Sequence, residues 1–522
     1  MFYLRFVLAI ALWIPAITLT ADDLPQTFTY QHEHVLGTSL EIQVQATSEL
    51  EATAAESRIL REISRLEKIF STYDSESEIS RWQRTKKQPT LVSPELREML
   101  TQSDRWIKLS GGAFQPGVEA IGRVWSAAAK RDELPSAEAL AAATTLANQK
   151  HWSIRASDNT ITRLTDCPLT LNAIAKGMIV ERACEAALAE KSIRGLIVNL
   201  GGDLRVCGDS IREVAIADPR NDAENAAPLT RIYVANRAVA TSGDYRRGYT
   251  IAGRHYSHIL DPRTGKPNDE VISATIVARS SHEADALATI CNVLPAAEGL
   301  ALIESLAGVD CLLVTKEGKQ YTSQHWSELT SPRLFRFSAT PFQVAFAADE
   351  PAEEAKKAEP ELLELLVKFE LSRPAGSQYR RPYVAIWLED EDEFPVRTAV
   401  LWMLTKQPGP RWHRDLLRWY RNDGVRKLAD ETALIGTISA STRGPGEYKA
   451  IFDGLDDAGQ PLKPGKYTLF IEVAREHGTY QLIRHPLTLG KDPLELTELK
   501  GNVEVKSASV EYRSRETDGE QK

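Results

Sequence analysis

Cysteine is scarce in this sequence, and no two cysteines form a Cys-x-x-Cys pair. Only five occur among 522 residues, and an odd number cannot all pair within one chain. This scarcity offers no ligand set for zinc or haem. We therefore expect small, buried, apolar side chains at these positions, with room for one disulfide in an oxidising compartment. The five are Cys167, Cys184, Cys207, Cys291 and Cys311.

The chain also lacks an excess of positive charge. Its 63 Lys and Arg residues face 72 Asp and Glu residues, which gives a net charge of −9. Such a balance disfavours nucleic acid or an anionic membrane surface as the main partner, so we expect membrane contact to be indirect. The hydrophobic share of 43% and charged share of 26% are ordinary for soluble proteins. The length indicates two or three domains.

The N-terminus contains an apolar run that is too short to span a membrane comfortably. Residues 6–19 are apolar, follow a basic start at Arg5, and precede small residues up to Ala21. This order is typical of a signal peptide, which we place at residues 1–21. No cysteine follows the run, so a lipid anchor is not expected. The protein is predicted to be exported to a Gram-negative-type periplasm and to be soluble there.

A charged, Ala- and Pro-rich stretch separates two regions of different texture. Residues 349–361 have no apolar face, which indicates a linker. Before it, residues 26–46 alternate like a pair of strands, and Ile59, Ile63 and Leu66 recur at the spacing of an amphipathic helix. Helical and strand patterns continue to interleave, which predicts a mixed α/β or α+β domain. After it, short strands alternate with Gly, Pro and Asp turns, which predicts an all-β, immunoglobulin-like sandwich. We place the domains at 28–337 and 363–515, joined by a linker at 338–362.

The stretch 240–267 concentrates glycines and groups that suit phosphate chemistry. Glycine lets a backbone turn tightly and approach a ligand closely. His258 and Asp261 interrupt an otherwise apolar strand end, which a structural hairpin would not need. A neutral imidazole can accept a proton near neutral pH, so His258 is a candidate base. A satisfied histidine at a strand end is the competing interpretation.

Two further patterns suggest a site for phosphate and metal. Residues 164–172 are apolar and extended, and they enter a helix through small residues beside Lys176; such a corner presents backbone amides to an anion. On the helix that begins near His282, Asp285 and Thr289 are four residues apart and share one face. They are oxygen ligands suited to Mg²⁺. On spacing alone, an acid that serves the helix dipole is the favoured explanation.

Six ordered blocks of the first region resemble the FAD:protein FMN transferase (ApbE) family. The resemblance spans about residues 28–337 and includes the corner and the helix just described. The blocks are Phe70–Ser80, Leu171–Gly177, Val198–Asp203, Ala240–Tyr245, Ser257–Gly265 and Ala284–Thr289. Each block alone is a weak signal, but six in family order are specific.

The resemblance implies an α+β enzyme that moves the FMN half of FAD to a Thr or Ser hydroxyl, with AMP as leaving group. The acceptor would be a flavoprotein of a membrane or periplasmic electron-transfer system. The resemblance suggests that Asp285, Thr289 and the main-chain carbonyl of Ala173 hold Mg²⁺, and we pair Asp285 with His258 as catalytic residues. The implied contacts with FAD are Leu36, Tyr73, Phe114, Gln115, Thr170, Lys176 and Ile259.

Two other functions compete with transfer. The same site could cleave FAD with water, as an FAD pyrophosphatase does, or the chain could be a non-catalytic periplasmic flavin-binding protein. The set formed by Asp285, Thr289 and Lys176 argues against a pure carrier, which needs no metal. The second domain resembles predicted periplasmic modules of unknown function. Its Thr442 lies in a segment loosely similar to a flavinylation motif, although a strand rich in Ser and Thr is the explanation that we prefer.

Overall fold

The computed structural model describes residues 25–331 and 363–514. The gaps within the first range are 86, 156, 191, 209–210, 222, 224, 244–247 and 269, and those within the second are 374–379, 405–412, 430–433, 476–478 and 491. The predicted signal peptide and linker lie outside the described residues, and the domain boundaries stay predictions. In the described part of the chain, no helix is long and apolar enough to cross a membrane.

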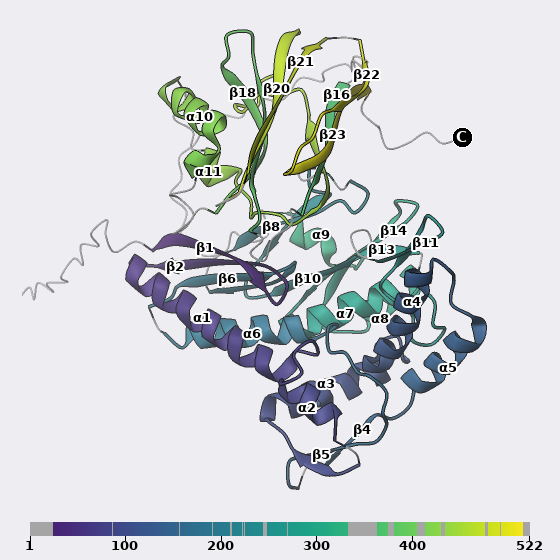
Figure 1. The fold of residues 1–522 in the computed structure, drawn as a ribbon. Coiled ribbons are helices and arrows are strands. Elements are labelled where there is room, and N and C mark those ends of the chain that lie inside the picture. Colours follow the sequence, from purple (N-terminus) through teal and green to yellow (C-terminus); the bar gives the residue numbers. More distant parts are fainter. Residues whose placement is uncertain are drawn as a thin grey trace, which may run out of the picture.

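An eight-stranded antiparallel sheet forms the centre of the first domain (Figure 1). Its first two strands are the predicted pair, and their alternation buries every second residue of β2. In spatial order the strands are β1 (Gln26–Val35), β2 (Thr38–Ala46), β6 (Gly195–Leu200), β7 (Asp203–Gly208), β10 (Ala238–Gly243), β13 (Val271–Ala278), β14 (Asp310–Thr315) and β15 (Gln320–Thr322).

Four helices cover one face of this sheet (Figure 1). In the longest helix, α1, the predicted periodic positions Ile59, Ile63 and Leu66 are buried in the main core, and Ser48 caps its first turn. The four helices are α1 (Glu49–Phe70), α6 (Ala175–Leu188), α7 (Ser281–Val293) and α8 (Ala296–Glu304). The opposite face packs against the β8–β9 pair (Arg212–Ile216 and Thr230–Val234) and α9 (Trp326–Leu329).

A smaller group of elements extends from the helical face. It comprises a three-stranded sheet, a hairpin and several helices. They are α2 (Glu78–Gln83), β3 (Pro89–Leu91), α3 (Pro94–Leu109), the 3-10 turn Pro116–Val118, α4 (Glu119–Arg131), α5 (Ala137–Ala147), β4 (Trp152–Arg155), β5 (Thr160–Arg163), β11 (Gly248–Ile251) and β12 (Arg254–Ser257). The stretch 164–172, predicted to be a strand, forms none, because its main-chain groups are held by side chains and single contacts rather than by a neighbouring strand.

The second domain consists of two four-stranded antiparallel sheets that share one apolar core. One sheet has the order β19 (Gly446–Phe452), β16 (Leu363–Leu371), β23 (Val505–Ser514) and β22 (Leu494–Leu499). The other has the order β18 (Pro395–Trp402), β17 (Tyr383–Glu389), β20 (Gly465–Ala474) and β21 (Tyr480–Leu489). The predicted strands are confirmed, while the immunoglobulin-like type of sandwich stays a prediction.

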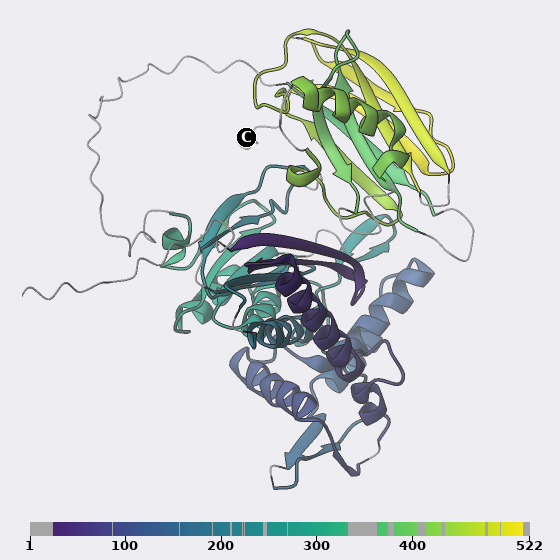
Figure 2. The same ribbon diagram turned by 90° about the vertical axis from the view of Figure 1, so that its left-hand side faces the viewer.

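Two helices that the sequence did not predict lie on this domain. Helix α10 (Leu417–Ala429) crosses the outer face of the second sheet (light green in Figure 2), and α11 (Leu434–Thr437) follows it. Glu472 on β20 accepts hydrogen bonds from the main-chain N–H groups of Arg418 and Trp419 at 2.9 and 2.8 Å. The first turn of α10 is therefore satisfied by a carboxylate from the sheet below it.

Candidate active site

The site is built where α6 begins, against the side of α7. The N–H of Gly177 donates to the Asp285 carboxylate at 2.9 Å. A Cβ at position 177 would lie 2.3 Å from the carbonyl oxygen of Ser281, so only glycine allows this approach. The two helices therefore bring Lys176 and Asp285 to one place.

Asp203 completes this cluster, and the sequence analysis did not single it out as a site residue. It begins β7 after the turn Gly201–Gly202, where both glycines have positive φ, of 61° and 99°. Its buried carboxylate accepts a hydrogen bond from the Lys176 ammonium group. The only sequence signal was its place in the Gly-Gly-Asp block.

Burial and the neighbouring Asp203 carboxylate together raise the pKa of Asp285 to about 7. Lys176 and the N–H of Gly177 oppose this shift, because both favour the charged carboxylate. Two carboxylates that share one poorly solvated place are stabilised by a cation between or beside them. The cluster therefore offers negative charge to a cation through its carboxylates and positive charge to an anion through Lys176.

The donor set fits Mg²⁺, which prefers oxygen ligands and usually takes only one or two carboxylates. Asp285 supplies a buried carboxylate, and Thr289, half-buried one turn further along α7, supplies a hydroxyl. The main-chain carbonyl of Ala173 belongs to the turn that leads into α6. In the described ranges no three His, Cys, Asp or Glu side chains gather as they would around a transition metal.

The predicted FAD contacts fall into three groups. Tyr73 is 85% exposed and its hydroxyl accepts a hydrogen bond from Asn172 at 3.0 Å, so it presents its ring to solvent beside the corner. The N–H of Thr170 donates to the carbonyl of Pro116 at 3.0 Å, which places Thr170 against the turn that follows Phe114 and Gln115. Both of those residues are buried.

The third group consists of Leu36, in the turn between β1 and β2, and Ile259, which follows β12. Leu36 sits in the β1–β2 turn with φ of 51° and packs, like Ala173, against the main core. Ile259 is buried in the same core, and the N–H of Asn268 donates to its carbonyl at 3.4 Å. His258, one residue earlier, has an exposed side chain.

Comparison with known proteins identifies the first domain. The ApbE family model matches residues 36–313, more than half of the chain. The chain belongs to the ApbE family. It is 30% identical over 335 residues to the FAD:protein FMN transferase of Vibrio cholerae, covering 61% of this chain and 99% of the relative. The ApbE protein of Thermotoga maritima superposes with a TM-score of 0.53 at 27% identity, over 59% of this chain and all of the other.

A second solved member supports the same assignment. The apo flavinyl transferase ApbE of Pseudomonas stutzeri superposes with a TM-score of 0.51 at 26% identity, covering 59% of this chain and 98% of the other. Residues 364–507 match a separate family, described as "Predicted periplasmic protein (DUF2271)". This ApbE-family chain therefore carries an additional module that follows the conserved fold.

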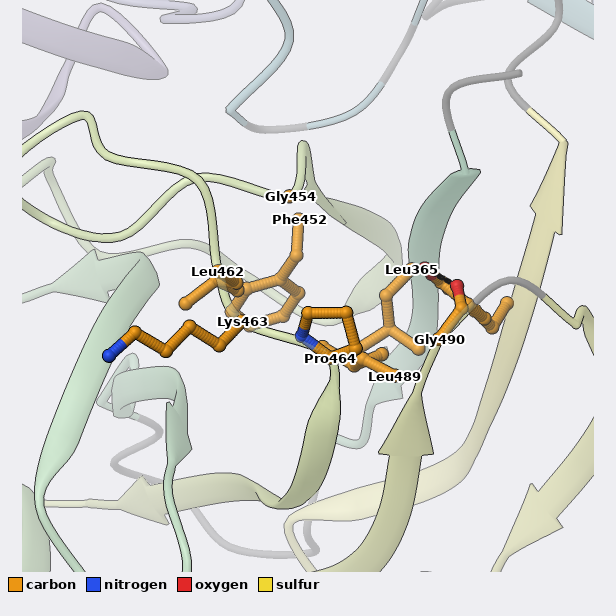
Figure 3. A pocket seen from close by; sticks show the side chains of 9 residues that line it. Leu365, Phe452, Gly454, Leu462, Lys463, Pro464, Leu489 and Gly490 are labelled. Atoms are coloured by element: carbon orange, nitrogen blue, oxygen red, sulfur yellow. Dashed lines mark hydrogen bonds between the residues drawn. The ribbon is translucent and has the colours of Figure 1, made fainter. Parts of the chain in front are cut away.

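Two cavities of the second domain lie apart from this cluster. One, of about 120 Å³, opens at the end of the sandwich core, and the ammonium end of Lys463 points away from Leu365 and Leu489 there (Figure 3). The other, of about 450 Å³, lies beside Arg418 and Arg484. No predicted site residue lines either cavity, so both are separate from the cluster at the start of α6.

Thr442 and the cysteines complete the account of the predicted residues. Thr442 is only 3% exposed and lies in an irregular segment, where its hydroxyl is hidden from another protein's active site. All five cysteines are buried, as predicted, and carry free thiols. Burial raises the pKa of Cys167 to about 11, which keeps this thiol protonated and unreactive at neutral pH.

Proposed function

We propose that this chain transfers the FMN half of FAD to a Thr or Ser hydroxyl of a partner flavoprotein, with Mg²⁺ and with AMP as leaving group. The observation that carries the proposal is the convergence of Lys176, Asp203 and Asp285 where α6 meets α7. Relatives named FAD:protein FMN transferase, one of them matched over 99% of its length, support the reaction class.

The residues at the corner suit the charge that develops when a diphosphate is cleaved. Mg²⁺, when bound, supplies charge neutralisation and orientation for the phosphate oxygens. Asp285, Thr289 and the carbonyl of Ala173 would hold it. Lys176, fixed by Asp203 at the start of α6, binds a phosphate oxygen as a point charge. The exposed ring of Tyr73 offers a face for the flavin or adenine ring.

The transfer forms one phosphoester bond and breaks the phosphoanhydride bond that joins the FMN and AMP halves of FAD. The acceptor hydroxyl oxygen bonds to the phosphorus of the FMN half, while the bond from that phosphorus to the bridging oxygen breaks. AMP leaves with the bridging oxygen. The hydroxyl proton passes to a base, and we assign this role to His258, whose exposed imidazole can meet a hydroxyl carried by another protein.

The acceptor belongs, in this proposal, to a membrane or periplasmic electron-transfer system. The signal peptide at 1–21 and the match of 364–507 to a predicted periplasmic family support export to the periplasm. In this proposal the transferase domain spans 28–337, and an immunoglobulin-like sandwich follows at 363–515. Because its Thr442 is buried, we do not propose that residue as an internal acceptor.

The test mixes the protein with FAD, Mg²⁺ and a candidate acceptor, followed by mass analysis of the acceptor. Covalent addition of one FMN, with AMP in solution, is the expected outcome. Free FMN together with AMP would instead identify an FAD pyrophosphatase. If the unmodified protein forms neither product and its FAD binding survives Asp285→Ala, the chain is a flavin-binding protein and the transferase is refuted.

A further inference from the structure

The segment between β5 and the turn that precedes α6 belongs to no sheet. It leaves β5 after Arg163 and runs to Leu171 without a neighbouring strand in the described structure. Isolated contacts hold it instead. The N–H of Leu164 donates to the carbonyl of His151 at 2.9 Å, and that of Thr170 donates to Pro116 at 3.0 Å.

Gln83 bonds both main-chain polar groups of one residue in this segment, Leu169. Its Oε1 accepts a hydrogen bond from the N–H of Leu169 at 2.9 Å, and its Nε2 donates to the carbonyl of the same residue at 3.2 Å. One carboxamide thus offers the donor and the acceptor that a paired strand would offer. Gln83 ends α2, which is anchored in the core by Ile79 and Trp82, so the carboxamide is held by a fixed element.

A short hydrogen-bonded turn connects Leu169 to Ala173, so a shift of the Leu169 main chain also moves the Ala173 carbonyl. The carbonyl of Leu171 accepts hydrogen bonds from the N–H groups of Ile174 and Ala175 at 3.1 and 2.8 Å. Ala173 lies inside this turn, four residues after Leu169. Its carbonyl therefore follows the placement of the segment that Gln83 grips.

We propose that Gln83 is a positioning residue that sets the Ala173 carbonyl relative to Asp285 and Thr289. The inference rests on the proposed function for the role of Ala173 as a metal ligand. Asp285 and Thr289 stand on α7, which is fixed by its own buried side chains. Loss of the Gln83 contact consequently displaces the Ala173 carbonyl, while Asp285 and Thr289 stay in place.

The test compares Gln83→Leu with Gln149→Leu, the same change at an exposed glutamine just after α5. Flavin fluorescence measures FAD binding across a Mg²⁺ titration, and hydrogen exchange measures protection of the Leu169 amide. In Gln83→Leu we expect faster exchange at Leu169 and at least about a fivefold higher Mg²⁺ concentration for half-maximal FAD binding. Gln149→Leu should match the unmodified protein. An unchanged Mg²⁺ requirement in folded Gln83→Leu overturns the proposal.

Gln83→Glu provides a second, pH-dependent readout should the leucine variant fail to fold. A protonated carboxyl can replace the carboxamide, whereas a carboxylate faces the Leu169 carbonyl with no proton to donate. The ratio of the Mg²⁺ requirement of this variant to that of the unmodified protein should be near one at acidic pH and rise at least about fivefold at alkaline pH. A ratio that stays constant overturns the proposal. Binding and FMN transfer are measured separately, so absence of transfer refutes the proposed function alone.

Discussion

The main-chain N–H of Gly177 donates to the carboxylate of Asp285 across 108 residues of sequence, and a Cβ at 177 would lie 2.8 Å from that of Asp285. This contact is both a packing constraint and part of the site. It fixes the start of α6 against α7, and it holds the carboxylate that we assign to the metal. A change at Gly177 should therefore affect stability and chemistry together, whereas a change at Asp285 should separate them.

Gly177→Ala should reduce both the stability of the fold and the rate of FMN transfer. The added methyl group would overlap the Ser281 carbonyl at 2.3 Å, and a backbone oxygen cannot move aside as a flexible side chain can. We expect a loss of about 1–3 kcal/mol in the free energy of unfolding, together with loss of FMN transfer. Chemical denaturation measures the first effect.

The control for this change is Gly122→Ala, at a glycine of α4 in the same domain. A Cβ there would meet only the Tyr249 hydroxyl, at an ordinary 3.6 Å. Alanine favours the helix, so stability should hold or rise by up to about 1 kcal/mol. Equal destabilisation by both variants would contradict the packing argument.

Asp285→Asn should spare the fold and remove the chemistry. An amide oxygen can still accept from Gly177, and repulsion with the Asp203 carboxylate disappears, so the melting temperature should hold or rise. Mg²⁺-dependent FAD binding should weaken by at least about tenfold. Titration calorimetry with FAD and Mg²⁺ measures this. Asp104→Asn, at an exposed carboxylate that accepts a hydrogen bond from Trp152 at 3.1 Å, is the control outside the site and should leave binding intact.

Local patterns in the sequence predicted the elements that local forces determine. The periodicity of Ile59, Ile63 and Leu66 was sufficient to identify α1, because each position faces the core at helical spacing. Helix α10 was missed because its first-turn amides are satisfied by Glu472, a residue of β20 that lies 54 positions beyond Arg418. Such a cap depends on tertiary structure and leaves no periodic signal.

In the site, too, the sequence predicts what local spacing determines and misses what depends on tertiary contacts. Spacing alone placed Asp285 and Thr289 on one helix face but gave no reason to join them to Lys176. That link came from the family resemblance, and the structure provides its physical basis in the glycine contact. Asp203 and Gln83 were missed as site residues, because their partners lie 27 and 86 residues away and are reached only in the folded chain.

Asn225→Ala should loosen the contact between the two domains. The carboxamide of Asn225, in the loop between β8 and β9, accepts from the N–H of Ile451 at 2.8 Å and donates to its carbonyl. Ile451 lies on β19, an edge strand of its sheet, so this side chain satisfies an open edge. Exchange of the Ile451 amide should accelerate about five- to tenfold. Asn221→Ala, in the same loop, should leave it unchanged, and equal rates in both variants would contradict the docking role.

A buried carboxylate should make the stability of the second domain depend on pH. Asp457 accepts a hydrogen bond from the N–H of Thr398 at 2.9 Å, while its Oδ2 is buried with no partner in the described structure. Burial, opposed by that hydrogen bond and by Arg397, raises the pKa of Asp457 to about 6, above its ordinary value of 3.8. The folded state therefore binds the proton more tightly than the unfolded state does.

The sign of the effect follows from this difference. The stability contributed by protonated Asp457 is complete below pH 4 and is lost as the pH rises through about 6. Asp457→Asn removes this dependence, so the variant should gain on the unmodified protein by about 2–3 kcal/mol between pH 4 and pH 7. Denaturant unfolding followed by tryptophan fluorescence at several pH values measures the difference in unfolding free energy. The prediction concerns the change of this difference with pH and not its absolute value. A difference that stays level across this range would show that the carboxylate is solvated in the folded domain.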